Sequence, residues 1–180
     1  EIAAIFADID KAGESGPGAL PRIMEWETEL EDGDGAPGAI APNPADWESE
    51  KGKYDFVGTL EALRSKIVGA GNLDRFDYWL KTFQSFRIMG EYGCVRHDFE
   101  TAADNEDWSA ALTLRKRMAR LWEQLMTLEV ERARNASDLG EIVNLEILNW
   151  KQLMVNKWDA ILEAGLGSSL PSDAYPSTNY

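Results

Sequence analysis

Three long segments of the chain repeat bulky apolar residues at intervals of three and four. The clearest covers residues 71–87, where the apolar positions are Leu73, Phe76, Trp79, Leu80, Phe83 and Phe86. This spacing has the period of an α-helix and not the alternation of a strand. The same pattern returns in 108–130 and 139–162. Because short connections between long helices favour antiparallel neighbours, the sequence predicts an all-α fold, an up-down bundle of about four long antiparallel helices.

The predicted helices divide the chain into three parts. Residues 1–52 hold a short helix, a segment at 20–30 that fits either a short strand or an extended stretch, and an irregular loop rich in Gly and Pro. Residues 53–165 form the helical bundle, and residues 166–180 resemble a linker-like tail. The chain begins at Glu1 with neither a Met nor a signal-like apolar stretch, and its last residues resemble a linker, so we expect a processed or excised piece of a longer protein.

Helix ends and core positions can also be predicted. We expect Asn72, then Asp104 or Asn105, then Ser137 to cap the starts of the three long helices, and Gly165 to Gly167 to end the last one. The residues expected to be buried together are Trp79, Phe83, Trp122, Leu125, Trp150 and Leu153. The last helix carries apolar residues on both faces, so we expect it either to be central or to pack against something outside this chain.

The charge balance excludes some classes of partner. Eighteen Lys and Arg against 32 Asp and Glu give a formal net charge of −14. Nucleic acids and anionic membrane surfaces both attract clustered cations, so we predict no nucleic-acid partner and no membrane partner. No apolar run reaches the length of about 18 residues that a membrane span needs.

The chain contains one Cys and one His, which limits metal chemistry. An intrachain disulfide is impossible, and a zinc site built from Cys and His ligands lacks donors. Glu91, Cys94, His97 and Glu100 are each three residues apart. A repeated step of three rotates progressively around a helix of 3.6 residues per turn, so these groups do not converge. We therefore predict no metal site and no cofactor.

A carbohydrate contact is conceivable at Glu25, Trp26 and Glu27. An indole face can stack on a sugar ring while carboxylates accept hydrogen bonds from its hydroxyl groups. Glycoside cleavage, however, uses two carboxyl groups on opposite sides of the bond, and Glu25 and Glu27 lie two residues apart on one face. We favour the interpretation that Glu25 and Glu27 are ordinary exposed acidic residues. The three residues remain candidate sugar contacts, and we predict no catalytic residue.

Residues 72–83 (NLDRFDYWLKTF), with residues 38–44 upstream, resemble the region that follows the catalytic barrel in large bacterial agarase-like glycoside hydrolases. The similarity covers residues 20–165. It implies a secreted parent enzyme, extracellular or periplasmic, in which this piece is a non-catalytic helical accessory domain. The general acid and the nucleophile would lie in a barrel that this chain lacks. The implied partners are that catalytic barrel domain and a galactan polysaccharide, with Glu25 and Trp26 near the barrel rim.

A second hypothesis belongs to a different class of function. The chain would be a stand-alone acidic helical protein-interaction module that docks a partner on an apolar helix face. The sequence beyond the two ends separates the hypotheses, because a barrel pattern of alternating strands and helices supports only the first.

Overall fold

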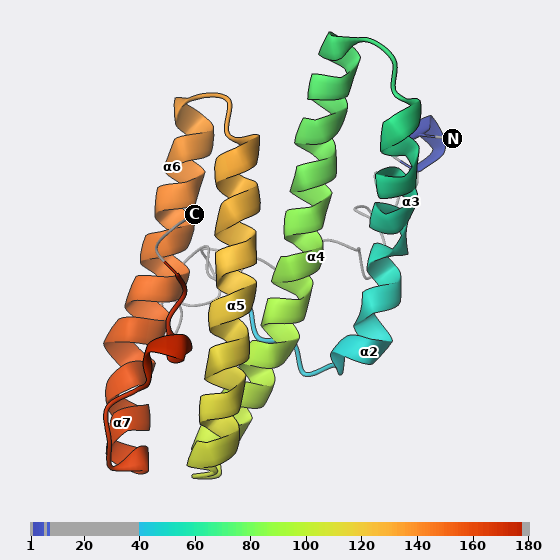
Figure 1. The fold of residues 1–180 in the computed structure, drawn as a ribbon. Coiled ribbons are helices and arrows are strands. Elements are labelled where there is room, and N and C mark those ends of the chain that lie inside the picture. The colour runs from blue at the N-terminus through green and yellow to red at the C-terminus, as the bar shows by residue number, and fades with distance from the viewer. Residues whose placement is uncertain (1, 6, 8–39, 178–180) are drawn as a thin grey trace.

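The computed structural model describes residues 2–5, 7 and 40–177 (Figure 1). Its long elements are α3 (Asp55–Leu63), α4 (Ala70–Asp104), α5 (Trp108–Arg132) and a continuous last helix made of α6 (Ala136–Leu145), the π-helix η3 (Glu146–Asp159) and α7 (Ala160–Leu166). The short elements are α2 (Trp47–Glu50), η1 (Lys51–Tyr54), η2 (Arg64–Lys66) and η4 (Ser172–Ala174). The predicted all-α up-down bundle is confirmed. The predicted strand or extended stretch at 20–30 lies outside the described residues.

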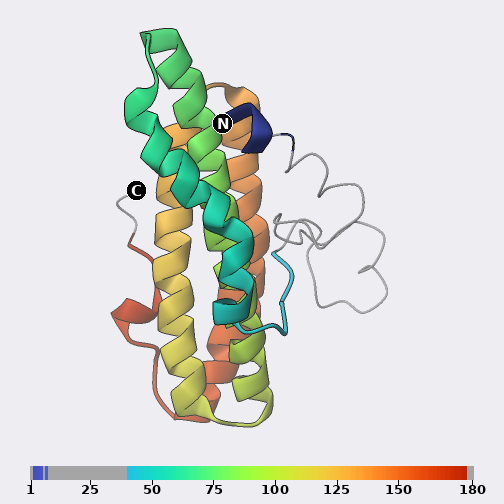
Figure 2. The same ribbon diagram turned by 90° about the vertical axis from the view of Figure 1, so that its right-hand side faces the viewer.

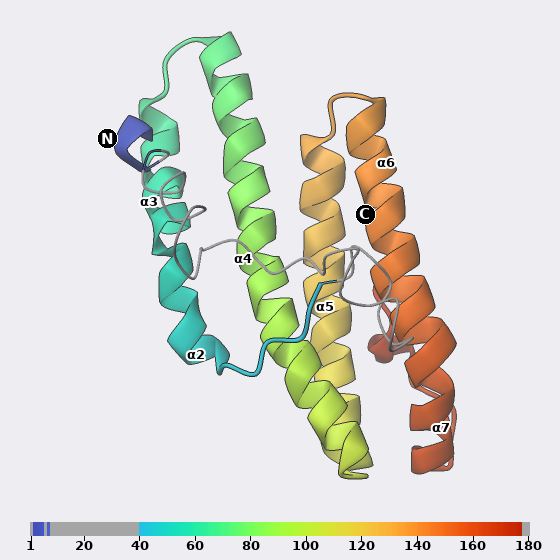
Figure 3. The ribbon, with the colours of Figure 1, turned by 180° about the vertical axis from the view of Figure 1, so that it is seen from behind.

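The long helices lie in a row, with α3 and the last helix at opposite edges and α4 and α5 between them (Figures 1 and 3). Seen from the α3 edge, the axes of α4, α5 and the last helix are roughly aligned, and α3 crosses them at an angle (Figure 2). The last helix therefore lies at an edge of the bundle, and the expectation that it is the central helix is wrong. It packs on α5, and near its C-terminal half also on α4, where the rings of Phe99 and Trp158 are 5.1 Å apart.

An extended segment before α2 ties two of these helices together. The backbone N–H of Ile40 donates to Oδ1 of Asn149 on η3 at 2.6 Å, and Arg96 on α4 donates to the Ile40 carbonyl at 2.7 Å. The Asn43 N–H donates to the Gly93 carbonyl at 2.9 Å. A Cβ on Gly93 would lie 2.8 Å from the Ala41 carbonyl oxygen, so glycine permits this close approach.

The helices start at other residues than predicted. α4 begins at Ala70, two residues before Asn72, because Gly69 adopts φ +93° and turns the chain into the helix. Asp107 caps α5 by accepting from the Ala110 N–H, and Asn135 caps α6 by accepting from Ser137 and Asp138. Asp104, Asn105 and Ser137 are thus not the capping residues. The predicted end is correct, since Gly167 takes the left-handed conformation directly after α7.

Two groups of buried apolar residues form the core. The large cluster joins α4, α5 and the last helix around Trp122, Leu125, Trp150 and Leu153, as predicted. The small cluster joins η1, α3 and the start of α4, and it consists of Tyr54, Val57, Leu60, Leu63, Phe76, Leu80 and Phe83. Two expectations are wrong. Phe83 is buried in the small cluster and not with Trp122, and Trp79 is 46% exposed. Trp79 is exposed because α4 has a helix on only two of its sides.

Candidate functional site

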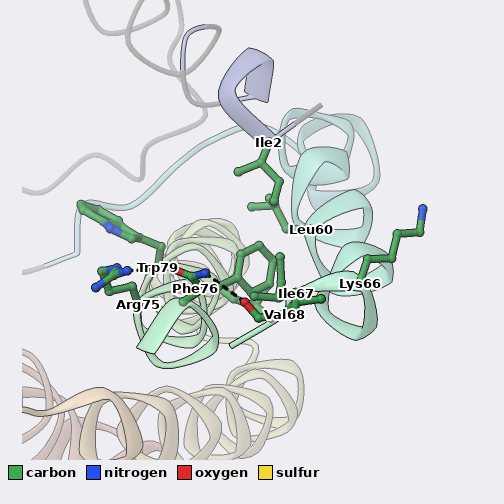
Figure 4. A pocket seen from close by; sticks show the side chains of 10 residues that line it. Ile2, Leu60, Lys66, Ile67, Val68, Arg75, Phe76 and Trp79 are labelled. Carbon is green, nitrogen blue, oxygen red and sulfur yellow. Dashed lines mark hydrogen bonds between the residues drawn. The ribbon is translucent and has the colours of Figure 1, made fainter. Parts of the chain in front are cut away.

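A pocket of about 500 Å³ opens between α3 and the first turns of α4 (Figure 4). Its lining comprises Ile2, Leu60, Lys66, Ile67, Val68, Asn72, Arg75, Phe76, Trp79 and Leu80. Half of these residues belong to the segment 72–83 that carries the family resemblance. The pocket volume lies within the range of about 300–1,000 Å³ typical of small-molecule sites.

The helical period explains how α4 supplies one wall. Asn72, Phe76 and Leu80 are spaced by four residues, as are Arg75 and Trp79, so they follow one side of the helix. The opposite wall comes from Leu60 on α3 and from Lys66, Ile67 and Val68, which connect the two helices. Ile2, in the described N-terminal helical residues, closes one side.

The floor and the rim of the pocket differ in exposure. Leu60, Phe76 and Leu80 are buried members of the small cluster. Val68 at the rim is 82% exposed and Trp79 is 46% exposed. The Trp79 ring stacks on Phe83 with centroids 6.0 Å apart, which supports the indole from behind. The pocket therefore offers a continuous apolar surface that begins in the core and reaches solvent.

Two cations stand beside this apolar surface. Arg75 donates to Oδ1 of Asn72 at 2.8 Å, and Asn72 donates in turn to the Val68 carbonyl at 2.9 Å (Figure 4). Among the described residues, neither Lys66 nor Arg75 forms an ion pair with a carboxylate. The two cations lie on opposite sides of the pocket, and the Lys66 side chain extends away from it (Figure 4).

The nearby carboxylates are occupied elsewhere. Asp77 pairs with Arg64 at 2.7 Å, and Glu61 pairs with Arg87 at 3.0 Å. Asp74 lies 3.5 Å from Arg134. These three carboxylates of α3 and α4 thus pair with cations that do not line the pocket.

A second surface lies on the last helix. Leu139, Val143, Ile147 and Val155 are between 38% and 57% exposed, and we call them the outer face. The first three are spaced by four residues and share one side of the helix. The exposed neighbours Gly140, Asn144, Gln152 and Asn156 are uncharged, and exposed Lys151 lies between Ile147 and Val155. A row of exposed apolar side chains that contains one charged residue, Lys151, is a candidate contact surface on so acidic a chain.

The predicted sugar contacts Glu25, Trp26 and Glu27 lie outside the described residues. The four residues considered as metal ligands, Glu91, Cys94, His97 and Glu100, do not share one site, because the two carboxylates pair with different arginines and the thiol is buried. Glu91 pairs with Arg117 at 2.8 Å, and Glu100 pairs with Arg96 at 2.8 Å. Burial raises the pKa of the Cys94 thiol to about 11. In the described part of the chain, no group of three or more His, Cys, Asp or Glu side chains is arranged to hold a metal ion.

Sequence reasoning missed the pocket because it assigned Trp79 to the core. A signal was present: polar Asn72 and Arg75 precede Trp79 by seven and four residues, and so share its side of the helix. Two polar residues on one side of a helix favour an exposed position for the Trp between them and the next turn. The place of Lys66 at the pocket could not be found from the sequence, because it depends on the turn between α3 and α4.

Comparison of the chain with protein-family models, with curated proteins and with solved structures found no match. Within the described residues, no helix combines the length and the apolar character that crossing a membrane requires.

Proposed function

We propose that the chain is a non-catalytic helical accessory domain of an agarase-like glycoside hydrolase, which packs against the catalytic barrel domain of its parent protein through the outer face. The family assignment rests on the similarity of residues 72–83. The observation that supports docking is the row of exposed apolar side chains Leu139, Val143 and Ile147 on the last helix. In this proposal the parent enzyme is secreted, and its barrel supplies the general acid and the nucleophile.

The outer face suits a contact between domains. It lies at the edge of the row of helices, where nothing in the described chain covers it (Figure 1). Burying apolar side chains there is favourable, and the scarcity of charge on this side avoids the cost of desolvating ions. The partner surface is accordingly apolar.

Cysteine labelling tests the docking. Val143→Cys places a thiol on the outer face, whereas Thr59→Cys places one on the exposed side of α3 at the opposite edge. The natural thiol of Cys94 is buried and gives a low background. We expect maleimide to label both variants equally fast in the isolated chain, and Val143→Cys at least about tenfold more slowly in the full parent protein. Equal labelling of both sites in the parent protein would contradict docking through the outer face.

The absence of catalysis and the sugar contact need separate assays. We expect the isolated chain to release no reducing ends from agarose or related galactans. Release that is lost in Glu25→Gln or Glu27→Gln would reveal a catalytic site and refute the accessory role. Retarded migration of the chain in agarose gels, abolished by Trp26→Ala, would support a galactan contact at the three candidate residues.

The alternative function is a stand-alone acidic protein-interaction module. The same outer face favours it, because an apolar strip on a chain of net charge −14 also fits a separate partner. The labelling experiment distinguishes the two. Protection of Val143→Cys that requires a separate polypeptide, and not a barrel within the same one, would support the module.

A further inference from the structure

We propose that residues 168–177, which we call the strap, form a latch that opens while the helices stay folded and that controls the access of water to the buried pair Arg115 and Asp159. In the closed state the strap covers a guanidinium that has hydrogen-bond donors without a partner. In the open state water reaches these donors. This inference concerns a different part of the molecule from the outer face and does not depend on the proposed function.

The strap runs back along the bundle after the last helix. Gly167 adopts the left-handed conformation at φ +67° directly after α7 and reverses the chain. The strap then passes along the last helix, and its short helix η4 contacts α5 (Figures 1 and 2). Leu170 and Ala174 are buried members of the large cluster. The strap therefore closes one side of that cluster.

The guanidinium of Arg115 lies next to the strap. Its Cζ is 4.3 Å from the centre of the Trp150 ring and 5.5 Å from the centre of the Tyr175 ring, so the strap supplies one of the two rings beside the charge. Arg115 is 0% exposed and donates through Nη2 to Asp159 at 3.0 Å. Its Nε and Nη1 are buried and have no hydrogen-bond partner in the described chain.

Few contacts hold the strap in place. Leu170 and Ala174 are its two buried side chains. The Leu170 N–H donates to Oε1 of Glu163 at 3.0 Å. The ion pair of Lys116 and Asp173, at 2.9 Å, is largely exposed and therefore stabilises the closed strap little. Because the long helices bury many more side chains than the strap does, we expect the strap to open well before they unfold.

The unpartnered donors of Arg115 favour opening. A buried N–H group without an acceptor has lost the hydrogen bonds that it makes in water, and this loss destabilises the closed state. Opening lets water hydrate Nε and Nη1 and so recovers part of the loss. Burial of Leu170 and Ala174 acts in the opposite direction. The strap thus exchanges a closed state that buries apolar groups for an open state that hydrates a charge.

Amide hydrogen exchange, followed by NMR at each residue of the full chain, tests the proposal. The reporter is the Ala174 N–H, which donates to the Pro171 carbonyl at 3.0 Å, and the reference is the Leu125 N–H in α5. We expect Ala174 to exchange at least about 100-fold faster than Leu125, yet more slowly than an unstructured peptide. Low concentrations of urea should leave the Ala174 rate unchanged, because opening of the strap exposes little surface.

A double variant distinguishes the latch from a purely structural contact. Arg115→Met/Asp159→Leu leaves no unpartnered donor under the strap, so Ala174 exchange should slow by about threefold or more. A guanidinium that only held the strap through the Tyr175 ring would give the opposite change, faster exchange. Tyr175→Phe, introduced into both chains, removes from this comparison the phenol that hydrogen-bonds to Asp159.

Two further variants complete the test. Arg64→Met/Asp77→Leu makes the same replacements in a surface pair far from the strap and should leave the Ala174 rate unchanged. Leu170→Ala removes the larger buried side chain of the strap without a change at the pair, and it should speed Ala174 exchange by about tenfold. Helical circular dichroism that matches the natural chain shows that each variant keeps its fold.

Several outcomes would overturn the proposal. Ala174 exchange as slow as that of Leu125, or equally steep in urea, would mean that the strap opens only when the whole chain unfolds. Exchange at the rate of an unstructured peptide would mean that the strap does not close. An unchanged or faster Ala174 rate in Arg115→Met/Asp159→Leu would show that the donors do not favour opening, and an unchanged rate in Leu170→Ala would show that Leu170 does not hold the strap.

Discussion

The two apolar clusters of this protein are built from the same kinds of residue but enclose them differently. The large cluster lies where α4, α5 and the last helix meet, and the stacked pair Trp122 and Trp150 at its centre is buried. The small cluster lies between α3 and the start of α4, and its edge opens into the pocket at Trp79. Three helices can surround a side chain, whereas two leave one side open. The number of neighbouring helices, and not apolar content, therefore decides which end forms a core and which end forms a site.

Polar groups divide in the same way. In the large cluster, Arg115 is 0% exposed, pairs with Asp159 at 3.0 Å, and lies 4.3 Å from the centre of the Trp150 ring. Around the small cluster, the pair Arg64 and Asp77 lies on the surface. When one partner of a buried pair is removed, the other charge stays buried and unsolvated. When one partner of a surface pair is removed, water solvates the charge that remains. The two ends should therefore respond differently to mutation.

The largest effect should come from a tryptophan in the large cluster. Trp122→Ala should lower the free energy of unfolding by about 3–5 kcal/mol, because a fully enclosed cavity remains. Phe83→Ala in the small cluster should cost less, since the open side lets the site relax, and exposed Trp79→Ala should cost under about 1 kcal/mol. Urea unfolding of the three variants measures this. A greater loss for Phe83→Ala than for Trp122→Ala would break the comparison.

The second largest loss in the free energy of unfolding should follow the removal of one buried carboxylate. Asp159→Ala leaves the Arg115 guanidinium buried without its partner, and we expect a loss of about 3–4 kcal/mol in the free energy of unfolding. Asp77→Ala, which breaks the surface pair with Arg64, is the matched control and should change stability little. The double variant Arg115→Met/Asp159→Leu should recover much of the loss, and a double variant as unstable as Asp159→Ala would contradict this account.

Two helical glycines sharpen the comparison between enclosed and open positions. A Cβ on Gly165 would lie 2.2 Å from the Trp108 ring, whereas a Cβ on Gly140 would meet nothing within 4 Å. Gly165→Ala should therefore destabilise by about 1–3 kcal/mol through overpacking. Gly140→Ala should stabilise by about 0.5–1 kcal/mol, because alanine restricts the unfolded chain. Thermal melting of both variants checks that the two shifts have opposite signs.

The smallest effect concerns alkaline pH. Burial raises the pKa of the Tyr54 phenol in the small cluster from 10.0 to about 12, and burial also raises the pKa of Tyr92 in the large one. The folded protein keeps these protons at a pH where the unfolded chain loses them. For Tyr54 this stabilisation is complete below about pH 10 and is lost as pH rises through 12, by at most about 1.4 kcal/mol per pH unit.

Tyr54→Phe should therefore make the fall of the urea midpoint between pH 10 and 12 shallower. Tyr92→Phe should do the same. Cys94, whose pKa is also raised by burial, contributes over pH 9 to 11 and remains in both variants. A fall that is equally steep in the natural chain and in both variants would show that neither phenol is linked to folding.

Much of the fold follows from local patterns, and the candidate site does not. The apolar period of α4, α5 and the last helix predicts their existence and type, because a helix must bury a stripe at that period. Their first residues differ from the predicted ones by a few positions, because Gly69 and Asp107 start α4 and α5 although neighbouring residues are equally suitable caps. The pocket needs α3, the turn at 67–69 and α4 together, and the way α3 packs against α4 cannot be read from the apolar period of either helix.

The sequence by itself determined the all-α class, the antiparallel order and the enclosed pair Trp122 and Trp150, because periodicity and short connections act between neighbours in the chain. Only the tertiary structure decided that the helices form a row. That arrangement places the last helix at an edge, exposes Leu139 and Val143, and leaves Trp79 outside the core. The physical reason is that exposure depends on which helix lies opposite each side chain, and a stripe of apolar residues is the same in the sequence whether or not a partner covers it.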